Sequence, residues 1–157
     1  MSNNAKHNFT PDLICCQMEG HHYLSCFCST DTAMPHIVFE TTPQLSGLLD
    51  FNALMTSIHG QLVERGYARL GDLKSRVYLS DQSLAGAEPD GQFLVARLTM
   101  SNPRPPEVQR EMGRVIHDAM HCAIEHTAPD FWWQCCVFVE TFNRLDYLKT
   151  DSRDLGA

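Results

Sequence analysis

The sequence predicts an α+β fold in which a β-α-β unit occurs twice, giving a four-stranded sheet with two helices on one face. Two segments carry apolar residues at helical spacing, and each lies between two segments rich in β-branched and aromatic residues. The resulting order is β-α-β-β-α-β. Because two helices can cover only one face of such a sheet, we expect oligomerisation to cover the other.

The first unit begins with a strand at residues 36–40, which combines β-branched and aromatic side chains. Asp50 can cap the N-terminus of a helix that ends at about Arg65, where Gly66 supplies a stop signal. The apolar stripe of this helix consists of Leu54, Ile58 and Leu62, with Phe51 and Met55 beside it. The second strand is predicted at residues 76–79.

The second unit begins with a clear strand at residues 92–100, followed by a turn at residues 101–105. A helix is predicted over residues 106–126 and the most hydrophobic strand over residues 131–141. The tail after Lys149 is polar, and we expect it to fray. The helix stripe consists of Val108, Met112, Ile116, Met120 and Ile124.

Composition restricts the class of protein. The chain has 157 residues, which favours one domain, and its net charge of −7 makes nucleic acid an unsuitable partner. No apolar run approaches the roughly 18 residues of a membrane span, and no signal peptide is evident, so we expect a cytoplasmic protein with no membrane partner. Seven cysteines form no disulfide framework, and we expect Cys122, Cys135 and Cys136 to be buried, unreactive thiols.

Residues 1–33 differ in character from the rest, since they show neither strand nor helix periodicity. Their Cys and His pairs match the spacing of structural zinc sites poorly, so we expect no metal there. Met34-Pro35 followed by a strand is typical of a chain whose working N-terminus is proline. A terminal proline is a secondary amine that can accept a proton, whereas an internal proline is an amide that cannot. We therefore expect residues 1–33 to be a disordered extension or a mis-set start, and residues 34–157 to form the domain.

Residues 34–149 resemble the 5-carboxymethyl-2-hydroxymuconate isomerases, a family of the tautomerase superfamily. The resemblance implies a homotrimer with active sites near subunit boundaries. It also implies a cofactor-independent isomerase of aromatic acid catabolism, in the homoprotocatechuate branch. The stretches that carry it are Met34-Pro35-His36, Leu73-Lys74-Ser75-Arg76-Val77, Leu98-Thr99-Met100, Arg104, Val139-Glu140 and Leu145-Asp146-Tyr147-Leu148-Lys149.

The resemblance also implies the roles of individual residues. Pro35 would be the catalytic base that removes a proton beside a conjugated dienol or keto acid and returns it to a different carbon. Arg104 would pair with a substrate carboxylate. Lys74 stands where relatives carry arginine, so that either Lys74 or Arg76 would bind the polycarboxylate substrate. His36 could line the pocket or be an ordinary strand residue.

Two alternatives to this function stay open. The first is a related enol–keto tautomerase acting on a smaller acid, with Lys74 tuning the pocket. The second is a non-catalytic trimeric binding protein, which would follow if residues 1–33 are retained. We interpret His117 and His121 as part of a solvated helix face rather than a metal site, and Trp132-Trp133 as core and subunit packing.

Overall fold

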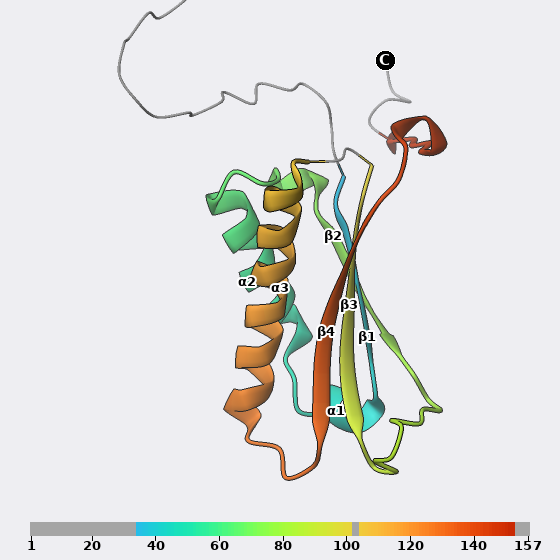
Figure 1. The fold of residues 1–157 in the computed structure, drawn as a ribbon. Coiled ribbons are helices and arrows are strands. Elements are labelled where there is room, and N and C mark those ends of the chain that lie inside the picture. The colour runs from blue at the N-terminus through green and yellow to red at the C-terminus, as the bar shows by residue number, and fades with distance from the viewer. Residues whose placement is uncertain (1–33, 102–103, 153–157) are drawn as a thin grey trace, which may run out of the picture.

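The computed structural model describes residues 34–101 and 104–152, so the predicted extension at residues 1–33 lies outside the described part. The order of the elements confirms the duplicated β-α-β prediction, with short helical turns added between them (Figure 1). The elements are β1 His36–Thr41, α1 Pro43–Ser46, α2 Phe51–Glu64, η1 Leu70–Asp72, β2 Lys74–Leu79, β3 Gln92–Met100, α3 Pro106–Thr127, β4 Trp133–Thr141 and η2 Arg144–Asp146.

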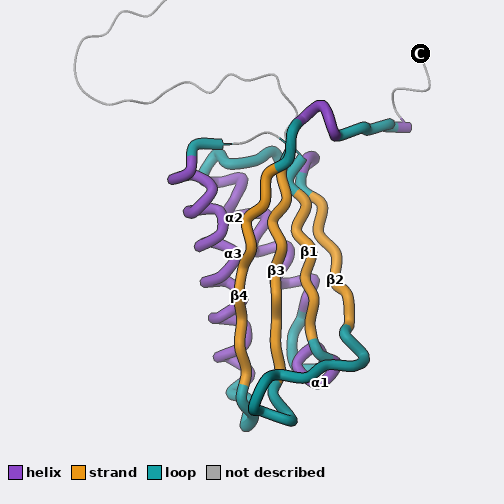
Figure 2. Tube along the Cα trace, turned by 45° about the vertical axis from the view of Figure 1, so that its right-hand side comes forward, coloured by secondary structure: helices purple, strands orange, loops and turns teal. Residues whose placement is uncertain are grey.

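The four strands form one sheet in the order β2-β1-β3-β4. Within each unit the two strands are parallel, β1 with β2 and β3 with β4, while the units meet through the antiparallel pair β1–β3. A crossover helix belongs to each parallel pair, and both helices, α2 and α3, lie on the same face of the sheet (Figures 1 and 2). The predicted α+β arrangement with helices on one face is therefore confirmed.

The core lies between the sheet and the helix layer, because alternate strand residues and one stripe of each helix meet there. In β3 every second residue is buried, from Gln92 to Met100. Helix α2 begins where the Asp50 carboxylate accepts the Ala53 N–H at 3.0 Å, and it ends before Gly66, whose φ of 71° breaks the helix. The fully buried large side chains are Ile37, Phe39, Leu45, Ile58, Leu62, Leu94, Leu98, Met100, Met112, Ile116, Met120 and Ile124.

The opposite face of the sheet, called the open face below, is covered by no helix of the described part (Figure 2). Strand alternation and register place His36, Val38 and Glu40 of β1 on it, beside Lys74, Arg76 and Tyr78 of β2 and, further across, Arg97 of β3 and Phe138 of β4. The Arg97 guanidinium lies 3.3 Å from a Glu140 carboxylate oxygen and 5.0 Å from the Phe138 ring centroid.

In the described residues, no helix combines the length and apolar content needed to cross a membrane.

Candidate active site

Pro35 is buried immediately before β1, at the end of the sheet where β1 and β2 both begin. Its carbonyl oxygen accepts the backbone N–H of Lys74 at 3.2 Å, so the first residues of the two parallel strands are locked together. Met34, one residue upstream, is only 6% exposed. The fold thus places the backbones of Pro35 and Lys74, two of the residues singled out from the sequence, side by side.

Two cations lie on the open face beside this strand start. Lys74 is paired in register with His36, and Arg76 with Val38. The Lys74 ammonium donates to the carbonyls of Gly71 at 2.7 Å and Leu73 at 3.3 Å. The Arg76 Nε donates to the Tyr78 hydroxyl at 3.2 Å, with its guanidinium 5.8 Å from the Tyr78 ring centroid. Within the described ranges neither cation pairs with a carboxylate, which leaves both available to an anionic ligand.

His36 lies between these cations and Pro35 in the chain, and its Nε2 is buried with no hydrogen-bond partner in the described part. Burial lowers the pKa of His36, and the positive charges of Arg76 and Lys74 lower it further. The imidazole is therefore neutral near pH 7. The buried His36 Nε2 has no hydrogen-bond partner, and the two neighbouring cations have no carboxylate partner, in the described part. An acidic ligand could supply both kinds of partner. The unpartnered Nε2 is compatible with the pocket interpretation of His36, which stays a prediction beside that of an ordinary strand residue.

Arg104 occupies a different side of the same end of the molecule. It precedes α3, which begins at the end where β1 begins (Figure 1). Its Nε and Nη2 both donate to the carbonyl oxygen of Tyr67, in the loop after α2, and its own carbonyl accepts from Gln109 at 2.6 Å. Partial burial lowers its pKa from the ordinary arginine value. Arg104 is therefore a positioned cation on the helix layer, whereas Lys74 and Arg76 lie on the open face.

The chain after β4 returns to the same end and contacts the residue before Pro35. The Phe142 N–H donates to the Met100 carbonyl at 3.2 Å, and the Phe142 and Tyr147 ring centroids are 5.7 Å apart. The Tyr147 hydroxyl reaches the Met34 sulfur at 3.4 Å. Sequence patterns assign Tyr147 no place in the site, because only the fold brings residues 113 positions apart together.

The histidines and cysteines elsewhere form no comparable site. His117 and His121 are half-exposed, yet they lie against β4: His117 Nε2 is 3.7 Å from the Cys135 sulfur, and the His121 ring centroid is 5.6 Å from that of Trp133. Among the described residues, no cluster of three or more His, Cys, Asp or Glu could hold a metal ion. Burial and the neighbouring Cys136 raise the pKa of Cys135, which disfavours its thiolate.

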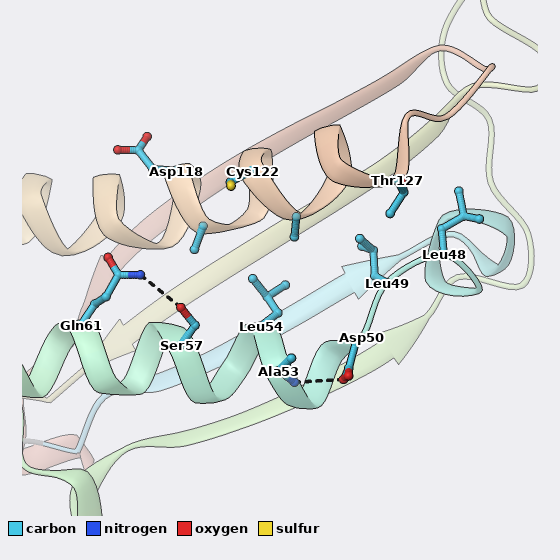
Figure 3. A pocket seen from close by; sticks show the side chains of 12 residues that line it. Leu48, Leu49, Asp50, Ala53, Leu54, Ser57, Gln61, Asp118, Cys122 and Thr127 are labelled. Atoms are coloured by element: carbon cyan, nitrogen blue, oxygen red, sulfur yellow. Dashed lines mark hydrogen bonds between the residues drawn. The ribbon is translucent and has the colours of Figure 1, made fainter.

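The prediction that Cys122 is buried is wrong, since its side chain is exposed. It borders an open groove of about 510 Å³ between α2 and α3, shown in Figure 3. Apolar side chains such as Leu49 and Leu54 line the groove, together with Asp50 and Asp118. None of the predicted site residues lines it, so the groove is separate from the Pro35 end of the sheet.

Solved structures share this fold at low sequence identity. A 5-carboxymethyl-2-hydroxymuconate isomerase from Deinococcus radiodurans R1 has a TM-score of 0.68 at 22% identity, over 77% of this chain and 92% of that one. A 5-carboxymethyl-2-hydroxymuconate delta-isomerase has a TM-score of 0.67 at 17% identity, over 78% and 91%. A fused 4-OT protein described as a symmetric trimer has a TM-score of 0.54 at 10% identity, over 78% and 99%.

The sequence profile of the 5-carboxymethyl-2-hydroxymuconate isomerase family matches residues 35–136, and this chain belongs to that family. The match begins at Pro35, the residue immediately before the first strand. No curated protein matches the chain in sequence.

Proposed function

We propose that this protein shifts a proton and a double bond within an unsaturated hydroxy- or oxo-polycarboxylate resembling 5-carboxymethyl-2-hydroxymuconate, with Pro35 as the base. The observation that carries the proposal is the placement of Pro35: a buried proline at a strand start, beside Lys74 and Arg76, which have no carboxylate partner in the described part. Membership of the isomerase family supports the reaction class. The pathway we propose is degradation of an aromatic acid, the homoprotocatechuate branch.

The proposed base requires a chain that starts at Pro35, with residues 34–157 encoding the functional domain. An α-amine titrates near pH 8 in water, and burial beside cations lowers that pKa toward neutrality. The unprotonated amine takes a proton from carbon, so a C–H bond breaks as an N–H bond forms. The electron pair moves through the conjugated system onto oxygen. The same proton is then delivered to a different carbon, which restores the free amine and relocates the double bond.

The cations have two tasks in this scheme. Lys74, Arg76 and Arg104 hold the substrate carboxylates and stabilise the negative charge that develops on the dienolate oxygen. Because Arg104 lies on the helix layer and the other two lie on the open face, a second copy of the chain is the natural means of joining them in one site. A homotrimer that covers the open faces of its subunits would supply this arrangement.

Two alternatives are favoured by particular residues. Lys74 keeps the charge of an arginine but not its forked geometry, which favours a smaller monocarboxylate or dicarboxylate substrate. Retention of residues 1–33 would make the Pro35 nitrogen an amide and leave a binding protein without this chemistry.

Three chains test the proposal: one starting at Pro35, the full chain, and a chain starting at residue 35 with Pro35→Ala. Each is assayed against a panel of unsaturated enolised mono-, di- and tricarboxylates. We expect turnover from the first chain and a loss of about 100-fold or more in the other two, the scale of general-base catalysis. Full turnover by the Pro35→Ala chain would refute the proposed mechanism. Intact-mass analysis of the native protein then establishes which chain the cell contains.

A further inference from the structure

The residue before Pro35 fills a buried space that the C-terminal segment closes. Met34 is only 6% exposed, and its sulfur accepts the Tyr147 hydroxyl at 3.4 Å. Phe142 packs against Tyr147, and its own N–H is tied to the end of β3 through Met100. The segment after β4 is therefore anchored to the end of β3 at Phe142 and reaches the residue before Pro35 through Tyr147.

Release of the Pro35 amine has a local consequence in this arrangement. Any chain that starts at Pro35 lacks Met34, so the buried space beside the proline nitrogen loses its occupant and the Tyr147 hydroxyl loses its acceptor. A half-buried hydroxyl without a partner is unfavourable, and a buried space lined by a polar group is one that a ligand or water fills. The new neighbour of Tyr147 then lies next to the Pro35 nitrogen, because Met34 is the residue bonded to that nitrogen.

The chemistry of the walls indicates what fills the space. The Tyr147 ring, which packs against Phe142, offers flat apolar surface of the kind that a conjugated carbon chain packs against. A phenol hydroxyl is a strong donor to a carboxylate or enolate oxygen. The cations Lys74 and Arg76 at the same strand starts favour an anion over a neutral ligand.

We propose that Tyr147 is a substrate-binding residue of the Pro35 site, whose hydroxyl donates to an acidic oxygen of an unsaturated acid occupying the space that Met34 fills. The inference rests on the proposed function for the identity of the ligand class. It also assigns a role to Met34: in any chain that retains it, its side chain blocks the site.

The test uses the full chain and binding alone, so that it does not depend on catalysis. The probe is cis,cis-muconate, a stable unsaturated dicarboxylate, and its Kd is measured by calorimetry for the unsubstituted chain, Met34→Ala and Met34→Ala/Tyr147→Phe. Met34→Ala opens the space but leaves Pro35 in an amide, so we expect binding without turnover. Tyr147→Phe keeps the ring and removes only the hydroxyl, and we expect it to weaken binding about tenfold, as for loss of a hydrogen bond to a charged group.

Met34→Ala/Leu148→Ala is the matched control, because Leu148 adjoins Tyr147 in the chain and is 93% exposed. It should bind as Met34→Ala does. The inference is overturned if Met34→Ala binds muconate no better than the unsubstituted chain, or if the Tyr147→Phe change leaves its Kd unaltered. Should Met34→Ala fail to fold, the same comparison of Kd is made between the Pro35-starting chain and its Tyr147→Phe variant. Absence of turnover in a Pro35-starting chain that binds muconate through Tyr147 would refute the proposed function and leave this inference standing.

Discussion

Gly113 of helix α3 packs against Val139 of strand β4, and its replacement by alanine has two opposing effects on stability. Gly113 is buried, and a Cβ built at this position would lie 2.9 Å from Val139 Cγ2. In a helix interior alanine is favoured over glycine by about 1 kcal/mol. Overpacking in a close-packed core costs about 1–3 kcal/mol, and the β-branched Val139 cannot easily turn aside. Because the steric cost exceeds the gain in helix propensity, we expect Gly113→Ala to destabilise the fold by about 1 kcal/mol.

Denaturant unfolding at fixed protein concentration measures this difference, and thermal unfolding should show a midpoint lower by about 4 °C. Val139→Ala removes the clashing methyl group. In the unsubstituted protein, Val139→Ala should lower the free energy of unfolding, because Val139 packs against the core. In the Gly113→Ala background the same change should lower it by at least about 1 kcal/mol less, which is the scale of coupling between residues in contact. If Gly113→Ala raises the free energy of unfolding and the two changes are additive, the clash with Val139 does not govern this position.

Three further predictions concern the cap, the buried histidine and the thiols. Asp50→Ala should lower the free energy of unfolding by about 1 kcal/mol through loss of the helix cap, whereas Asp50→Asn should retain most of it, as measured by urea titration. Because folding lowers the pKa of His36, the unfolded chain binds more protons than the folded chain as pH drops below 6.5, and the free energy of unfolding should fall with it. His36→Gln should flatten this pH dependence in denaturant titrations at several pH values. An unchanged slope would contradict the prediction. In mass-spectrometric mapping with iodoacetamide, Cys122 should react before Cys135, because Cys122 is exposed and burial raises the pKa of the Cys135 thiol; equal labelling would count against this.

Local signals predict most of the fold. The Asp50 cap, the Gly66 stop and the stripe of Leu54, Ile58 and Leu62 are each encoded within a few residues, and all are found in α2. Strand β2 begins two residues earlier than its sequence pattern predicts, because Lys74, Arg76 and Tyr78 alternate with less polar residues on an exposed edge strand and show no apolar run.

The site is predictable only in part. Pro35 and Lys74 are neighbours because β1 and β2 pair in parallel, and the predicted β-α-β unit places these two strands in one sheet. The contact between Tyr147 and Met34 depends on how the tail folds back, which no local pattern encodes. The exposure of Cys122 escapes prediction because its helical neighbours Ala119 and Ala123 are small, and a groove remains beside them.

The duplication within one chain has a consequence for any reaction that depends on a terminal amine. β3 begins the second unit as β1 begins the first, yet a single polypeptide has one N-terminus. Under the proposed function, one strand start at most can therefore carry a free amine for the two structural units. The residue before β3, Gly91, sits where an added Cβ would meet Ala85 at 2.8 Å and Trp132 at 2.9 Å. That strand start is closed by packing. Under the proposed function, a chain that holds two such units therefore has one reactive end where two separate units would have two, and the start of β3 serves as a structural joint.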